Sequence, residues 1–180
     1  MPAIDSIAEL MDGARRILAP GITTEALERV GRLLAAASRQ AGFLPAATLS
    51  TMHQSDSSAA VLQSDADGLT LVLGEFSPVA ETPVHDHGAW GIACILRGAD
   101  RYRHYDPPGG GPGGVPRLRL ERILKPGDVV TWLDPPEDIH SQQGINEPAL
   151  EIILFGKNVM TMPRHYYELS TGRITSALPQ

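Results

Sequence analysis

Short β-rich segments, separated by glycine and proline, occupy the middle of this 180-residue chain. The first runs from Leu69 to Phe76, and five more follow before residue 156. They are Trp90–Leu96, Arg101–Tyr105, Leu118–Leu124, Val129–Leu133 and Leu150–Phe155. Short strands at regular spacing, with turn residues between them, are typical of an all-β sandwich or barrel. The sequence therefore predicts that the chain is built around such a β domain.

Two helical patterns precede the β-rich region. Apolar side chains recur at helical spacing within residues 4–18 and again within residues 27–41. Thr23 or Thr24 can act as the N-cap of the second helix, because a hydroxyl oxygen there can accept a backbone N–H. We expect this helical pair to pack outside the β domain. The polar segment 50–68 predicts connecting structure.

Charge and composition argue against several classes of protein. The net charge is −6 and no run of basic residues is present, so nucleic acid is not an expected partner. No segment approaches the roughly 20 apolar residues of a membrane helix, and the first residues do not resemble a secretory signal. We therefore expect no membrane partner and a cytoplasmic location. The single cysteine, Cys94, rules out the usual thiolate zinc spacings.

Three of the six histidines form a candidate metal site. His85 and His87 are separated by Asp86, and alternate residues of a strand point to the same face. Two neighbouring imidazoles can share one metal ion. His140 comes 53 residues after His87, behind a turn, a strand and a proline-rich corner. Only the fold can bring it to the other two.

Together these segments resemble the two motifs of the cupin superfamily. The first motif is matched by Gly74, His85, His87 and Gly98, and the second by Gly127, Pro136 and His140. The resemblance implies a double-stranded β-helix barrel with the metal bound inside it. It also implies a single domain over residues 1–180, with the helices in 1–45 and the metal-binding barrel core in 69–156. A homodimer is an expectation from the same resemblance.

The glutamate that usually completes the first cupin motif is missing. Its position falls at Gly91 or Ile92, neither of which can bind a metal through its side chain. Three neutral histidines would leave a divalent ion its full charge, which favours an anionic ligand such as a thiolate. Among cupins, the segments 83–91 and 135–141 resemble the thiol dioxygenases, of the cysteine and 3-mercaptopropionate types. The resemblance implies Fe²⁺, although nickel, zinc or another divalent ion suits three imidazoles as well.

The late strand departs from that family. Thiol dioxygenases carry a Ser, a His and a Tyr at alternate positions there, and these positions are Glu151, Ile153 and Phe155 in this chain. Such a hydroxyl or imidazole can contribute about 10²–10⁴-fold to a rate. We hypothesise that a tyrosine replaces the missing hydroxyl. The candidates are Tyr102, Tyr105 and Tyr166, and Tyr105 is our choice as a catalytic residue.

Arg164 is the candidate for recognising a substrate carboxylate. By resemblance to the mercaptopropionate enzymes, an arginine nine residues after the late-strand tyrosine position, here Phe155, holds the carboxylate. A guanidinium can do so through two parallel hydrogen bonds. The competing interpretation is an arginine that is exposed at the surface or ion-paired.

The leading functional hypothesis is therefore an iron enzyme that oxidises a small thiol-bearing acid to its sulfinic acid with O2. One alternative is another metal-dependent cupin enzyme, such as a carbon–carbon bond-cleaving dioxygenase or an isomerase. The other is a non-catalytic cupin that binds a ligand.

Overall fold

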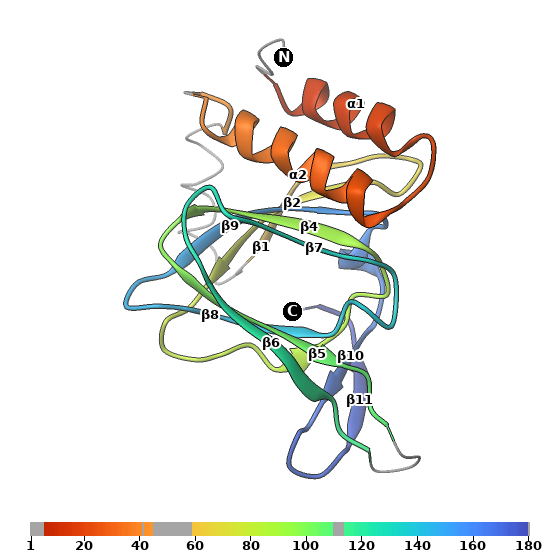
Figure 1. The fold of residues 1–180 in the computed structure, drawn as a ribbon, viewed down its shortest axis with the longest axis vertical. Helices are drawn as coiled ribbons and strands as arrows, with labels where there is room; N and C mark the ends of the chain where they lie inside the picture. The colour runs from red at the N-terminus through yellow and green to blue at the C-terminus, as the bar shows by residue number, and fades with distance from the viewer. Residues whose placement is uncertain (1–5, 41, 45–58, 110–113, 180) are drawn as a thin grey trace.

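Two antiparallel sheets and a pair of helices make up the described part of the chain. The computed structural model describes residues 6–40, 42–44, 59–109 and 114–179. Figure 1 shows α1 and α2 side by side across the outer face of one sheet, with the second sheet on the opposite side. The predicted all-β barrel with an external helical pair is confirmed.

The helices begin where the sequence provides caps. α1 (Ile7–Leu18) starts after Ser6, whose hydroxyl accepts the backbone N–H of Glu9. α2 (Thr24–Ser38) starts after Thr23, whose hydroxyl accepts the N–H of Ala26, so Thr23 is the N-cap. Neither helix is long and apolar enough to cross a bilayer, within the residues described.

The sheet beneath the helices has five strands in the order β1-β2-β9-β4-β7. Their bounds are β1 (Ala59–Ser64), β2 (Thr70–Phe76), β9 (Ala149–Phe155), β4 (Gly91–Arg97) and β7 (Val129–Trp132). A Cβ on Gly31 of α2 would lie 2.6 Å from Val129 Cγ1, so this glycine allows α2 to approach β7 closely. β1 corrects the prediction of connecting structure over 50–68. Residues 50–58, which include His53, lie outside the described part.

The second sheet has six strands in the order β11-β10-β3-β8-β5-β6. Their bounds are β11 (Ile174–Ala177), β10 (Arg164–Tyr167), β3 (Val84–His85), β8 (His140–Gly144), β5 (Asp100–Asp106) and β6 (Arg117–Leu124). A short 3₁₀ turn, Val159–Thr161, leads from β9 toward β10. β1, β10 and β11 lie outside the 69–156 range that we expected to form the barrel core.

Alternation along β9 separates two hydrophobic layers. Leu150, Ile152 and Leu154 belong to the cluster that packs under α1 and α2. Ile153 and Phe155 belong to a different cluster, together with residues such as Tyr102 and Trp132 that lie between the two sheets. Because successive side chains of a strand point to opposite faces, Glu151 shares the inward face with Ile153 and Phe155. The interior of the barrel is where the candidate site lies.

Candidate metal centre

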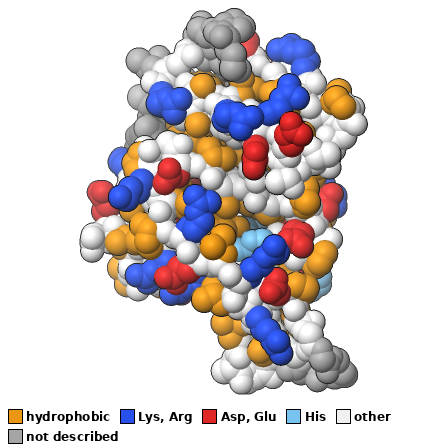
Figure 2. Space-filling model, in the orientation of Figure 1, with side chains coloured by type: hydrophobic (Ala, Val, Ile, Leu, Met, Phe, Trp, Pro, Cys, Tyr) orange, Lys and Arg blue, Asp and Glu red, His pale blue; other side chains and the backbone are white. Residues whose placement is uncertain are grey.

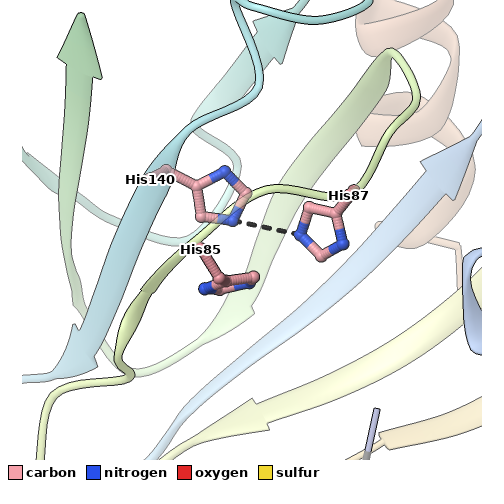
Figure 3. A group of neighbouring side chains, drawn as sticks. All are labelled: His85, His87 and His140. Carbon is pink, nitrogen blue, oxygen red and sulfur yellow. Dashed lines mark hydrogen bonds between the residues drawn. The ribbon is translucent and has the colours of Figure 1, made fainter. Parts of the chain in front are cut away.

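His85, His87 and His140 come together inside the barrel, as the motifs predicted. Their nitrogen ligand atoms all lie within 4.8 Å of one another. His85 and His140 are directly opposite each other on β3 and β8, and His87 follows β3 after its last residue. Figure 3 shows the three rings converging from these two segments. His87 therefore reaches the group from a loop, although we expected it to lie on the strand.

The donor atoms fit a metal ion. His87 Nε2 and His140 Nε2 face each other at 3.2 Å. Two imidazole nitrogens on one ion, each at about 2.1 Å and subtending 90–109°, would be about 3.0–3.4 Å apart. His85 Nδ1 donates to the carbonyl oxygen of Pro83 at 2.9 Å, which leaves its Nε2 lone pair free for a metal.

Burial keeps these imidazoles neutral. All three are at most 5% exposed. Burial lowers the pKa of His85 to about 4, and lowers those of His87 and His140 well below the ordinary value. Neighbouring imidazoles and the charge of Arg164 act in the same direction on His87 and His140. Neutral imidazole is the form that binds metals, so the site is ready for an ion at neutral pH.

Trp132 occupies the place of a fourth ligand from the first motif. Gly91 pairs with Trp132 across β4 and β7, and a Cβ on Gly91 would lie 2.2 Å from the indole ring. The indole N–H donates to the carbonyl of Ala89 at 3.1 Å, and the ring packs on His140 with centroids 5.1 Å apart. No side chain fits at residue 91, and Ile92 packs in the hydrophobic cluster beneath the helices, so neither position can direct a glutamate to the histidines.

The three histidines open onto a cavity of about 590 Å³. Apolar side chains form much of its wall, including Val72, Trp132, Ile153, Phe155 and Met160. The end of β11 and the following Leu178 and Pro179 also line it. Figure 2 shows one face of the molecule, on which positive and negative side chains are intermingled with apolar ones.

Arg164 lines this cavity, close enough to the histidines for its charge to lower their pKa values. It makes no ion pair with any residue that the structure describes, and its buried Nε has no hydrogen-bond partner there. Within the described ranges, its side chain has one polar contact, a 4.0 Å approach of Nη2 to Met160 Sδ. An unpaired guanidinium in a cavity is a ready site for an anion.

The three tyrosine candidates lie in different places. Tyr166 pairs with His85 across β10 and β3, stacks on its ring at 6.1 Å, and lines the cavity. Tyr102 is buried inside the barrel with its ring 5.5 Å from His140, and its hydroxyl has no partner among the described residues. Tyr105 lies on the opposite face of β5 and bonds to Ser141 at 3.3 Å. Tyr105 is not among the cavity-lining residues, so Tyr166 is the better candidate.

Asp86, which lies between two of the histidines, connects β10 to the site through hydrogen bonds. We did not predict this role. Its carboxylate accepts the backbone N–H of His165 (2.9 Å), the ring Nδ1 of His165 (2.9 Å) and the hydroxyl of Tyr167 (2.8 Å). These bonds hold the strand that carries Arg164 and Tyr166. Asp138, next to the third histidine, accepts the backbone N–H groups of His87 and Gly88.

Asp86→Ala should loosen β10. It removes three hydrogen bonds to a largely buried carboxylate, so we expect the free energy of unfolding to fall by about 2 kcal/mol. Urea denaturation of the metal-free protein measures this change. Asp86→Asn is the matched control, because its amide can still bond to the same partners and should restore most of the stability. An alanine variant as stable as the wild type would show that these bonds do not hold the strand.

Asp100 and Glu151 form a second buried polar group, inside the barrel. Both are fully buried and both accept Gln142 Nε2, at 3.3 and 2.9 Å. Burial raises the pKa of Asp100 to about 7, and nearby Glu81 adds to this effect. Burial and the charge of Asp100 raise the pKa of Glu151 well above its ordinary value. Both carboxyls therefore bind protons more tightly in the folded than in the unfolded chain.

This pair should make stability fall as pH rises. A carboxyl with a raised folded pKa contributes stability below its unfolded pKa of about 4, and that contribution is lost as pH rises through the folded value. Glu151→Gln should therefore gain stability relative to wild type between pH 5 and 8, by up to about 1.4 kcal/mol per pH unit. Urea unfolding across this range tests it. The exposed Glu28→Gln is the control, and a pH-independent difference for Glu151→Gln would contradict the prediction.

The solved structures that are similar to this chain include cupin-like proteins. No protein-family model matches the chain. A cupin-like protein from Thermotoga maritima aligns over 63% of this chain and 77% of its own, with 26% identity and a TM-score of 0.42. The DMSP lyase DddQ from Ruegeria pomeroyi aligns over 67% of this chain but only half of its own, with 20% identity and a TM-score of 0.41.

A third similar structure is an uncharacterized protein with a double-stranded β-helix domain from Klebsiella pneumoniae. It aligns over 69% of this chain and 89% of its own, with 15% identity and a TM-score of 0.41. The strand order and the inward-facing histidines of this chain carry the assignment independently of these similarities. The chain therefore has the double-stranded β-helix fold of the cupins, with a three-histidine group that can hold a metal ion.

Proposed function

We propose that this protein is a non-haem iron thiol dioxygenase that oxidises a thiol-bearing acid to its sulfinic acid. The observation that supports it best is the pairing of two features in one cavity. Three neutral imidazoles without a carboxylate ligand favour an anionic sulfur ligand, and the unpaired Arg164 guanidinium suits a carboxylate. A substrate that carries both groups satisfies both sites.

In this proposal His85, His87 and His140 would hold the iron ion. Iron bound there would supply a binding site for the thiolate and for O2, and a route for electrons between them. The overall reaction is balanced without another reductant: R–SH and O2 give R–SO2H, so sulfur is oxidised and both oxygen atoms are transferred to it.

The side chains around the histidines would bind and orient the substrate. Arg164 pairs with the carboxylate and so fixes the direction in which the thiol points. Tyr166, stacked on His85, supplies a hydroxyl at the cavity wall in place of the one missing at Phe155. Trp132, Phe155 and Ile153 exclude water from the reacting atoms.

Oxygen consumption tests this function directly. The iron(II)-loaded protein is incubated with cysteine, 3-mercaptopropionate or cysteamine, and O2 uptake is followed together with sulfinic acid formation. We expect uptake with at least one of the two acids, at one O2 per sulfinate formed, and weaker uptake with cysteamine because it lacks a carboxylate. Absence of uptake with all three thiols would reject the proposal.

One observation favours a second candidate function. The cavity, about 590 Å³, is far larger than a three-carbon acid needs, and the inward positions Ile153 and Phe155 are apolar. These features suit a bulkier anionic substrate of another metal-dependent cupin reaction, such as carbon–carbon cleavage or isomerisation. A non-catalytic ligand-binding cupin is the remaining alternative, and purified protein without stoichiometric metal would support it.

A further inference from the structure

Gln142 presents to the cavity a hydrogen-bond acceptor that no described residue uses. It follows His140 by two residues on β8, so both side chains lie on the same face of the strand. Gln142 is only 4% exposed and lines the cavity. Nothing in the local sequence pattern distinguishes it from Gln143, so the sequence alone does not indicate a role for it.

The amide of Gln142 is held in one orientation. Its Nε2 donates to Asp100 Oδ2 at 3.3 Å and to Glu151 Oε2 at 2.9 Å, so both N–H groups are used. Among the described residues none donates to its Oε1, and this oxygen is not one of the buried unpartnered atoms. Oε1 is therefore accessible from the cavity, where only a hydrogen-bond donor can satisfy it.

The surroundings of this oxygen favour a positively charged donor. Asp100 and Glu151 are completely buried behind the amide, and neither forms an ion pair with a Lys or Arg in the described ranges. The pair becomes negative when either carboxyl ionises, and burial places the pKa of Asp100 at about 7. A cation in front of Gln142 would be attracted by it, whereas an anion would be repelled.

Gln142 and Arg164 lie on opposite sides of the histidines. Tyr166 is opposite His85, and Arg164 lies two residues from Tyr166, toward the His87 end. His140 is also opposite His85, and Gln142 lies beside Thr82, whose hydroxyl accepts its backbone N–H at 2.9 Å. A ligand held at the histidines can therefore extend an anionic group toward one side and a donor group toward the other.

We propose that Gln142 Oε1 accepts a hydrogen bond from a substrate ammonium group, so that the site selects a thiol-bearing amino acid over the same acid without its amino group. The inference rests on the proposed function and names its substrate class. Gln142 determines specificity through its carbonyl, and Asp100 and Glu151 are positioning residues that fix the direction of the amide.

Ligand binding to the zinc(II)-loaded, oxygen-free protein tests the proposal without catalysis. Calorimetry gives the Kd of cysteine and of 3-mercaptopropionate for the wild type and for Gln142→Met, which keeps the side-chain length but lacks the acceptor. A hydrogen bond to a charged group corresponds to about 10-fold or more in affinity. We expect the ratio of the two Kd values to shrink by about 10-fold in Gln142→Met, with the Kd of 3-mercaptopropionate unchanged.

Comparing ratios removes any preference that arises from the amino group binding the zinc itself, because that preference is common to both proteins. Gln142→Asn is the second variant, in case Gln142→Met does not fold. Its side chain keeps the amide but is shorter by one methylene, so it should also lose the preference for cysteine over 3-mercaptopropionate. Arg164→Gln should weaken both ligands and leave their ratio unchanged.

An unchanged ratio in a folded Gln142 variant would overturn the inference. So would 3-mercaptolactate binding to the wild type as tightly as cysteine, because a neutral hydroxyl would then be as good a donor as the ammonium group. These outcomes are independent of O2 uptake. If the protein does not consume O2 with thiols, the Kd ratios can still be measured. If the Kd ratios do not change in the Gln142 variants, O2 uptake by the wild type is unaffected.

Discussion

His140→Ala should abolish stoichiometric metal binding and, with it, any metal-dependent activity. His140 supplies one of three converging nitrogen atoms, and its Nε2 lies 3.2 Å from that of His87. Protein sites gain several kcal/mol of metal affinity from each ligand, so we expect the affinity for a divalent ion to fall on the order of 10²–10³-fold. Titration with zinc(II) or anaerobic iron(II), followed by elemental analysis after gel filtration, measures the change.

His104→Gln is the matched control for that experiment. His104 pairs with His140 across β5 and β8, yet it is not a member of the metal-binding group. It should keep one metal ion per chain. Equal metal loss in both variants would indicate a general effect on the barrel, and full metal retention by His140→Ala would exclude His140 as a ligand.

Arg164→Gln should raise the KM, or the Kd, for a carboxylate-bearing thiol by about 30–1,000-fold. The guanidinium has no ion-pair partner among the residues described, so a substrate carboxylate would be its main partner in the cavity. Loss of a buried, charge-assisted pair costs about 2–4 kcal/mol. Arg164→Lys should recover only part of the affinity, because an ammonium group cannot make the two parallel hydrogen bonds.

A thiol without a carboxylate provides the internal control. Cysteamine should bind to Arg164→Gln within about threefold of its affinity for the wild type, since no charge pair is lost. The exposed Arg173→Gln, which removes only an ion pair with Glu168, should behave as wild type with both thiols. If cysteamine and 3-mercaptopropionate lost affinity equally in Arg164→Gln, Arg164 would not be the carboxylate site.

The central strands and the histidine group could be predicted from the sequence, because their signals are local. β2, β4, β5, β6, β7 and β9 lie close to the predicted segments, since each is an apolar or alternating run between turn residues. β3 has only two residues and β1 lies in a polar segment, so neither produces such a pattern. The cupin motifs identified the three histidines because, in proteins with these motifs, the fold brings the histidines of both motifs together.

The remaining features of the site depend on strand register, which the sequence does not reveal. Tyr105 was one of three tyrosine candidates for a hydroxyl in the pocket, but alternation directs it to the face opposite Tyr102, where it bonds to Ser141. The orientation of the Gln142 amide could not be predicted from the sequence, because it depends on the contact with Glu151 on another strand. The hydrogen bonds between Asp86 and β10 likewise could not be predicted, because they join residues far apart in the sequence: Asp86 and His165 are separated by 79 positions.

Diffraction from crystals of the iron(II)-loaded protein, measured on both sides of the iron absorption edge, tests the central claim most directly. We expect one anomalous peak per chain, between His85, His87 and His140, at about 2.0–2.2 Å from one nitrogen of each ring. A peak elsewhere, or an ion that contacts fewer than three of these rings, would contradict it.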